Sequence, residues 1–176
     1  MKVSLKKLLP LVLLLSLAAC AVMDQAPAPT LESNAKWALL PFLNHTETPQ
    51  AGLRAETITE NLLRSLGARN LQRYPATLNK ETLLDATESK VVAEAMNWAK
   101  QQGVRYALTG NVDEWRYKVG IDGEPAVGIT LQLLDVQSGA VVWSGVAAGT
   151  GWSRDGLSAV AQKLIKEMLV KAKLPQ

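Results

Sequence analysis

The sequence has one histidine and one cysteine in 176 residues, and this scarcity excludes several kinds of site. A single imidazole cannot build a histidine-rich metal centre, and any Ser-His-Asp arrangement would have to use His45. Neither GxGxxG nor the phosphate-binding GxxxxGK[ST] pattern occurs, so nothing supports nucleotide binding. His45 lies in a polar stretch and is expected to be a solvated loop residue. We therefore expect no metal, no cofactor and no enzymatic activity.

The chain also lacks a surplus of positive charge outside its first residues. The formal charge of +3 at pH 7 equals the contribution of Lys2, Lys6 and Lys7, and without them cations and anions are equal in number. A nucleic-acid-binding surface needs clustered cations on the folded part of a protein. Nucleic acid is therefore not expected as a partner.

The first twenty residues have the pattern of an export signal with a lipidation site. Three lysines precede an apolar stretch from Leu8 to Leu17, which is too short to span a membrane as a helix. The sequence Leu-Ala-Ala-Cys at 17–20 resembles the bacterial lipobox, in which the cysteine is diacylated and the preceding peptide bond is cut. The alternative is an ordinary signal with a chance cysteine. Because Cys20 is the only cysteine, the folded part contains no disulfide.

These features divide the chain into three parts. We expect residues 1–19 to be a lipoprotein signal peptide, residues 20–35 to be the lipidated cysteine and a flexible tether, and residues 36–176 to form a single α/β domain. Bacterial sorting rules retain lipoproteins with an aspartate directly after the cysteine in the inner membrane. Because Ala21 stands there, we expect an anchor in the outer membrane and a domain on its periplasmic face.

Hydrophobic spacing predicts alternating strands and helices in the domain. Strands are expected at 37–40, 71–74, 104–119, 127–136 and 140–148, and helices at 53–66, from Asn79 to Gly103, and from 157 onward. Pro41 is expected to stop the first strand, and the first helix is expected to direct Glu56 to solvent. The order predicts an α/β fold, a mixed sheet with a C-terminal antiparallel meander and helices packed on one face.

Four stretches that together cover most of the mature domain carry a family resemblance. They are WALLPFLNHTETPQAG at 37–52, GVRYALTGNVDEWRYKVGIDGEPAVG at 103–128, LQLLDVQSGAVVWSG at 131–145 and GTGWSRDGLSAVAQKL at 149–164. These stretches resemble the PelC family, outer-membrane lipoproteins of Pel polysaccharide export. The DVQSGAVVWSG stretch also resembles the wider class of periplasmic lipoproteins that includes CsgG, LpoB and the TolB N-terminal domain.

The resemblance implies a fold, an assembly and a role. The fold would be like that of CsgG and the TolB N-terminal domain, and the subunits would form a homo-oligomeric ring, a dodecamer. The partner would be the outer-membrane β-barrel protein PelB. In that family the ring presents aromatic side chains to the membrane and an acidic surface to Pel, a cationic, partly deacetylated amino-sugar exopolymer of biofilms. We therefore expect a non-enzymatic ring that guides Pel to its exporter.

Two tryptophans are candidates for contacts outside the subunit. Trp152 lies among glycines, without apolar neighbours at strand or helix spacing, and its indole suits the headgroup layer of a membrane. A ring with one such residue per subunit would carry an aromatic belt. The alternative is that Trp152 folds back on the core. Trp143, beside Val141 and Val142, either packs in the core or contacts a neighbouring subunit.

Acidic residues gather in the meander and its turns. Asp113 and Asp122 are the candidates for guiding the polysaccharide, because one inward carboxylate per subunit becomes a circle of charge in a ring. Asp122 is equally typical of an ordinary turn. Asp113 and Glu114 are adjacent on a strand and are expected on opposite faces, which is poor geometry for a two-carboxylate hydrolase. Three arginines are candidates for pairing with carboxylates across subunits: Arg105, Arg116 and Arg154.

Two other functions stay open. One is an interaction protein, either a lipoprotein activator of a cell-wall synthase or a CsgG-like secretion component. The other is a periplasmic glycan hydrolase, which would need two carboxylates that converge in one cleft.

Overall fold

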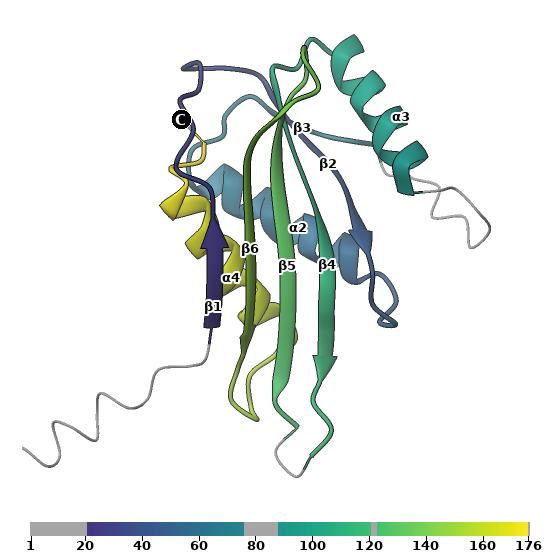
Figure 1. Ribbon diagram of the computed structural model, residues 1–176, viewed down its shortest axis with the longest axis vertical. Helices are drawn as coiled ribbons and strands as arrows, with labels where there is room; N and C mark the ends of the chain where they lie inside the picture. Colours follow the sequence, from purple (N-terminus) through teal and green to yellow (C-terminus); the bar gives the residue numbers. More distant parts are fainter. Residues whose placement is uncertain (1–20, 76–87, 121–122, 176) are drawn as a thin grey trace, which may run out of the picture.

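The structure, a computed structural model, describes residues 21–75, 88–120 and 123–175. Its centre is a six-stranded mixed sheet with the strand order β1-β6-β5-β4-β2-β3 (Figure 1). The strands are β1 (Ala21–Gln25), β2 (Trp37–Asn44), β3 (Leu71–Arg73), β4 (Tyr106–Tyr117), β5 (Pro125–Asp135) and β6 (Val141–Thr150). The helices are α2 (Ala51–Ser65), α3 (Glu88–Gln101) and α4 (Leu157–Lys171).

The predicted α/β fold with a C-terminal meander is confirmed. β4, β5 and β6 pair antiparallel in chain order, whereas β2 runs parallel to both β3 and β4. The β5–β6 turn is short, and Gly139 there has a φ of 75°, a conformation that glycine adopts without steric cost. The meander therefore places the ends of β4 and β6 at the same end of the sheet.

Two helices cover one face of the sheet, and the third lies on the other. In Figure 1, α2 and α4 lie behind the sheet, where they pack on Leu39, Leu108, Ile129, Leu131 and Leu133. The expectation of a single covered face therefore holds for α2 and α4, whereas α3 packs Ala95 and Ala99 against Ala38 and Leu40 of β2. The reason is that β2 is apolar at consecutive positions, and a strand of that kind needs cover on both faces.

β2 also continues through Pro41, where a stop was expected. The pairing of β2 with β4 shifts register between Leu39 and Phe42, so the proline sits at an irregularity of the ladder where its missing N–H is tolerated. The Pro41 carbonyl still accepts a hydrogen bond of 2.9 Å from Thr109 Oγ1. Proline therefore marks a bulge here and not a strand end.

The expectation of a flexible tether is wrong for residues 21–25, which form β1. This strand pairs antiparallel with β6 and closes that edge of the sheet. The chain stays on the domain beyond it, because the Ala26 N–H donates to Ser144 O at 2.9 Å and the Glu32 N–H donates to the Tyr106 hydroxyl at 3.2 Å. The unpaired backbone groups of β6 offer this segment partners that its own composition does not reveal.

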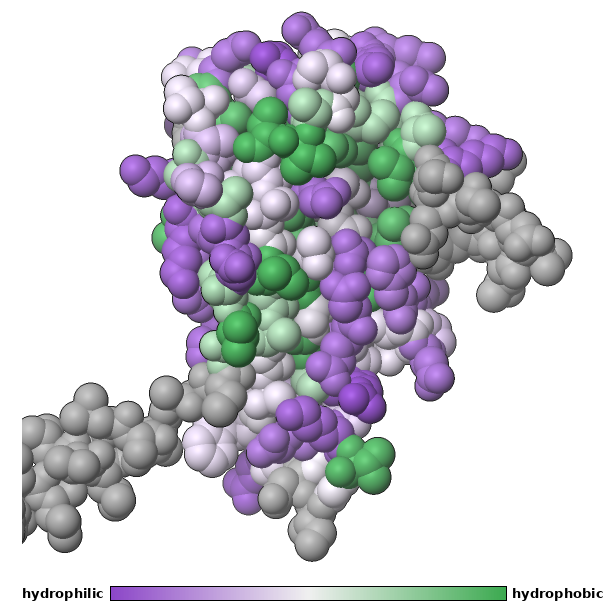
Figure 2. Space-filling view, viewed as in Figure 1, coloured by the Kyte–Doolittle hydropathy of each residue, from purple (hydrophilic) through white to green (hydrophobic). Residues whose placement is uncertain are grey.

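The strands β1, β6, β5 and β4 leave the face opposite α2 and α4 largely uncovered, and we call this the open face. Side chains that alternate with the core residues point to it, and they include Asp24, Thr130, Gln132, Ser144 and Val146. Figure 2 shows polar and apolar groups interspersed over this side of the molecule. The open face is therefore a mixed surface on which charged groups stand out.

Candidate functional site

Asp113 lies at an irregularity in β4. The register with β5 shifts between Val112 and Glu114, which leaves Asp113 as an extra residue in a β-bulge. As a result, a Cβ built on Gly128 would lie 3.3 Å from the Glu114 Cβ and 3.8 Å from the Asp113 Cβ. The expectation that Asp113 and Glu114 point to opposite faces is wrong, because strict alternation requires an unbroken ladder.

Three side chains hold the Asp113 carboxylate on the open face. Asn111 Nδ2 donates to Oδ1 at 2.6 Å, Thr130 Oγ1 donates to Oδ2 at 3.1 Å, and His45 Nδ1 lies 3.1 Å from Oδ1. The Asp113 side chain remains 44% exposed. His45 was expected to be only a solvated loop residue, and its contact with Asp113 was not foreseen. No local sequence pattern links His45 to Asp113, because the two are far apart in the sequence. The carboxylate is thus both held in place and accessible.

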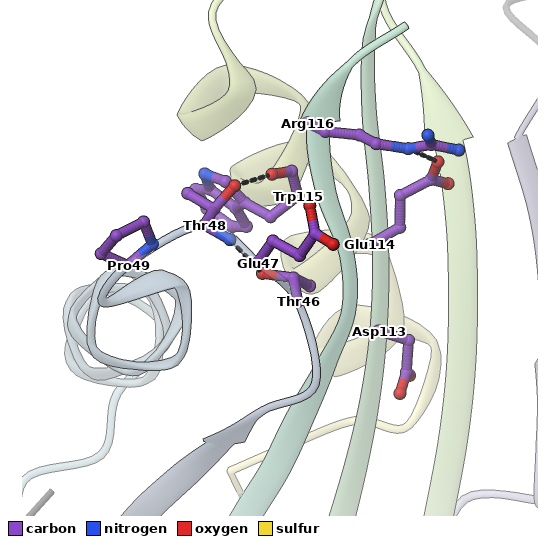
Figure 3. Close-up of a pocket in the computed structure, with 8 residues that line it drawn as sticks. All are labelled: Thr46, Glu47, Thr48, Pro49, Asp113, Glu114, Trp115 and Arg116. Atoms are coloured by element: carbon purple, nitrogen blue, oxygen red, sulfur yellow. Dashed lines mark hydrogen bonds and ion pairs between the residues drawn. The ribbon is translucent and has the colours of Figure 1, made fainter. Parts of the chain in front are cut away.

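A pocket of about 760 Å³ opens beside Asp113, between β4 and the loop that joins β2 to α2 (Figure 3). It is lined by Thr46, Glu47, Thr48, Pro49, Asp113, Glu114, Trp115 and Arg116. Thr48 Oγ1 donates to the Trp115 carbonyl at 2.5 Å, and Asn44 Nδ2 donates to the Thr48 carbonyl at 2.9 Å. These two bonds fix the loop against β4.

The pocket is acidic. Its lining carries the carboxylates of Glu47, Asp113 and Glu114 and the guanidinium of Arg116. Arg116 Nε donates to Glu114 Oε1 at 2.9 Å, and Figure 3 shows both side chains extending away from Pro49. An exposed acidic pocket of this kind attracts cations without a deep binding site.

Trp152 lies in the loop between β6 and α4 with 63% of its surface exposed. The Gly151 N–H donates to the Pro125 carbonyl at 2.9 Å, which ties this loop to the start of β5. The Trp152 N–H donates to Asp155 Oδ2 at 2.9 Å, and the Asp155 N–H donates back to the Trp152 carbonyl at 2.8 Å. Asp155 therefore closes the loop, while Gly156 occupies the N-cap of α4. The indole is displayed by an ordered turn.

Trp143 is a core residue. Its side chain is buried, and its Nε1 donates to the Ala26 carbonyl at 3.2 Å. Of the two alternatives for Trp143, core packing is confirmed. The side chain is not available as a subunit contact, because the segment after β1 covers it.

The three arginines proposed as subunit contacts differ in their surroundings. Arg105 pairs within its own subunit, with Nε 2.8 Å from Glu32 Oε1 and Nη1 2.5 Å from Asp135 Oδ2. Arg116 pairs with its near neighbour Glu114, and Arg154 is exposed in the Trp152 loop. Arg105 thus joins the N-terminal segment to the end of β5, whereas contacts of Arg116 and Arg154 across subunits stay a prediction.

The Arg105 cluster predicts an acid-sensitive contribution to stability. The Ser138 backbone N–H and the Arg105 guanidinium lower the pKa of Asp135 from 3.8 to about 2. Because the pKa is lower in the folded state, the contribution of Asp135 is present above its ordinary pKa and is lost as pH falls from about 4 to about 2. Asp135→Asn should therefore lose less stability than the natural chain over this window in urea unfolding. A Glu167→Gln control should keep the natural profile, and an unchanged profile for Asp135→Asn would contradict the assignment.

Some predicted features lie outside the described residues. These are the signal peptide at 1–19, the lipidation site Cys20, the helix cap Asn79 and the carboxylate Asp122. Within the described ranges, no three His, Cys, Asp or Glu residues are grouped so that they could hold a metal ion. No helix in the same ranges is long and apolar enough to cross a bilayer.

Comparisons with known proteins identify relatives. A family model for the peptidoglycan-synthase activator LpoB matches residues 45–148. A PelC dodecamer from Paraburkholderia phytofirmans is 42% identical, covers 89% of this chain and 100% of its own, and superposes with a TM-score of 0.74. A second PelC dodecamer from that organism is 43% identical over 86% of this chain and 98% of its own, with a TM-score of 0.71.

A more distant structure shares the fold. Lipoprotein GNA1162 from Neisseria meningitidis is 21% identical over 80% of this chain and 95% of its own, with a TM-score of 0.53. No curated protein sequence matches the chain. On the identity and coverage of the Paraburkholderia structures, together with the family match, this chain belongs to the PelC family, within the broader group that the LpoB model describes.

Proposed function

We propose that this chain is a non-enzymatic, lipid-anchored subunit of a dodecameric ring on the periplasmic face of the outer membrane. The ring guides the cationic Pel polysaccharide to the β-barrel exporter PelB. The observation that carries this proposal is the similarity to PelC, which forms a dodecamer in the related structures and is similar over nearly the whole described chain.

The acidic groups of the open face support the guiding role. Asp113, Glu114 and Glu47 lie around one exposed pocket, and Asp24 stands on the same open face. In a dodecamer each carboxylate is repeated twelve times, so a weak attraction in one subunit becomes a band of negative potential. Such a band holds a polycation loosely and lets it slide, which suits transport better than a tight site. Asp122 belongs to this proposal as a second guiding carboxylate.

Membrane contact by Trp152 supports the location of the ring. An indole that is 63% exposed on an ordered turn is costly in water and favourable at the headgroup layer. Together with acyl chains on Cys20, twelve such side chains would form a belt that orients the ring on the membrane.

The guiding role predicts that Asp113→Asn lowers polysaccharide export several-fold while the fold is kept. The amide preserves the shape of the carboxylate but removes its charge, so the attraction for a polycation decreases. The measurement is the amount of polymer secreted by a strain whose only copy of the gene encodes the variant. Retention of a partly deacetylated N-acetylglucosamine oligomer on the purified assembly should fall as well, and added salt should weaken the retention by the natural chain.

Glu167→Gln is the matched control, because it removes the same charge from α4, on the covered side of the sheet. Glu167 pairs with Lys171 at 2.9 Å on the helix surface and should contribute nothing to export. Natural export by Asp113→Asn, or an equal loss in both variants, would argue against guidance by this carboxylate.

The LpoB family match supports a second candidate, an activator of a peptidoglycan synthase. That function needs a surface that binds another protein and no band of negative charge. Stimulation of glycan polymerisation by the purified chain, unaffected by Asp113→Asn, would favour the activator over the ring.

A further inference from the structure

The sheet register brings three separate parts of the chain to one end of the molecule. Ala21 pairs with Gly149 of β6, Gly149 pairs with Val127 of β5, and Val127 pairs with Trp115 of β4. These four residues form one row across the sheet. The chain beyond this row is the residue before Ala21, the loop after β6, and the hairpin between β4 and β5. We call this the anchor end (Figure 1).

The predicted lipidation site belongs to the anchor end by covalent connection. Cys20 precedes Ala21, so their Cα atoms are about 3.8 Å apart across one trans peptide bond. β1 begins at Ala21 and is paired with β6 from its first residue. No flexible linker therefore lies between acyl chains on Cys20 and the sheet. Lipid on that cysteine would hold this end of the domain at the membrane surface.

The β4–β5 hairpin displays apolar and aromatic groups at the same end. Val119 is fully exposed and Tyr117 is about half exposed, so this end of the hairpin presents one aliphatic and one aromatic side chain to its surroundings. Figure 2 shows an isolated apolar group near the lower end of the molecule, beyond the end of β4 in Figure 1. The two arms of the hairpin are joined next to the sheet, because the Lys118 N–H donates to the Glu124 carbonyl at 2.8 Å.

The hairpin and the Trp152 loop form one surface. The Gly151 N–H donates to the Pro125 carbonyl, so the residue before Trp152 is bonded to the residue that begins β5. Both segments carry exposed charges of both signs, and the cations Lys118 and Arg154 suit the phosphates of phospholipid headgroups, whereas Glu124 and Asp155 do not. The tip thus has the aromatic, aliphatic and cationic groups that proteins place at a membrane interface.

We propose that the β4 side of the β4–β5 hairpin, from Tyr117 to Val119, is a second membrane-contacting element, which enters the headgroup layer through Val119 and Tyr117 beside Trp152. The inference rests on the proposed placement of Trp152 at the membrane. It adds a second contact, because Trp152 could reach the membrane without the hairpin. The lipid on Cys20, the Trp152 loop and the hairpin then dock the domain with its strands pointing at the bilayer. The turn between β5 and β6 is at the far end and points away from it.

The single cysteine of the chain permits a direct test. Because Cys20 is consumed by lipid, Val119→Cys introduces the only thiol that can be labelled with an environment-sensitive fluorophore. The lipidated chain is reconstituted in vesicles of phosphatidylethanolamine and phosphatidylglycerol. We expect the fluorescence emission of the label at 119 to shift to the blue relative to the same labelled chain in buffer without vesicles. We also expect lipids that carry a spin label near the headgroup to quench this fluorescence. A label at Gln137→Cys, in the exposed turn between β5 and β6, should show neither.

A third label, Ser153→Cys, separates the inference from the proposal on which it rests. If the labels at 119 and 153 both shift, the hairpin and the Trp152 loop both contact lipid. If only the label at 153 shifts, the hairpin inference is wrong and the placement of Trp152 stands. If neither shifts, or if 137 shifts as much as 119, both are overturned.

Discussion

Replacing Arg73 by alanine should lower the free energy of unfolding by about 3–5 kcal/mol, because it leaves a buried carboxylate without its cation. That carboxylate is Glu56, whose surface is 3% exposed in α2. Arg73 Nε lies 2.6 Å from Glu56 Oε1, and Arg73 Nη1 lies 3.2 Å from Glu60 Oε2. Urea unfolding of the chain from Ala21 onward measures the difference.

The size of this effect follows from burial. Desolvation raises the pKa of Glu56, and the Arg73 charge and the Phe42 backbone N–H oppose the shift without cancelling it. With Arg73 removed, the folded state must either keep an uncompensated charge or bind a proton. The deficit of Arg73→Ala should therefore shrink as pH falls toward 4.5, the ordinary pKa of the carboxyl, because protonation removes the buried charge.

Arg64→Ala is the matched control. Arg64 pairs with Glu60 at 2.8 Å, but the pair is solvent-exposed at i,i+4 spacing and contributes about 0–1 kcal/mol. Adding Glu56→Gln to Arg73→Ala should recover part of the loss, since the amide carries no charge. An equal effect of Arg64→Ala and Arg73→Ala, or a deficit that does not depend on pH, would show that Arg73 does not stabilise Glu56.

Burial of Glu56 is a part of the fold that could not be predicted from the sequence. Helical spacing correctly placed Ala55 and Leu62 in the core, but it put Glu56 on the solvent side. The error arises because β3 lies at the edge of the sheet next to α2 and brings Arg73 over that side of the helix. A charged residue can be buried when a partner that is distant in the sequence compensates its charge. The local periodicity of the helix does not predict such a partner.

The meander was predictable because its signals are local. Long apolar alternation and short glycine turns fix three antiparallel strands without knowledge of anything distant. The bulge at Asp113 lies within such a strand and was missed, since one extra residue leaves no mark in composition. Gly128 is the nearest signal for it, because a Cβ at this position would lie only 3.3 Å from the Cβ and the backbone nitrogen of Glu114. Exposure of Trp152, in contrast, follows from its glycine-rich surroundings.

For the N-terminal segment, the local conformation could be predicted from the sequence but its pairing with the sheet could not. Two prolines and the lack of a periodic apolar pattern favour an extended chain, and that is correct as a conformational preference. An extended chain is, however, also what an unpaired strand edge binds, and β6 supplies that edge to residues 21–25. The tether that the composition favours is thus replaced by a strand, which changes the expected distance between domain and membrane.

Cys20→Ala should abolish fatty-acid incorporation and move the protein from the membrane fraction to the periplasmic fluid. Each buried methylene contributes about 0.8 kcal/mol, one acyl chain gives only marginal binding, and two or more give durable anchoring. Polysaccharide export should fall to the level of a strain without the protein. Metabolic labelling with a radioactive fatty acid checks the modification, and incorporation that survives Cys20→Ala would refute it.

A linker variant separates attachment from positioning. Inserting a flexible Gly-Ser segment of about ten residues between Cys20 and Ala21 keeps the lipid but allows the domain to move roughly 17 Å from it. If the start of β1 sets the height of the domain, membrane fractionation should be unchanged while export decreases, because Trp152 and the hairpin are then held at the bilayer only by their own weak affinity. Full export by this variant would mean that the lipid alone matters and that the strand directly after Cys20 has no role in docking.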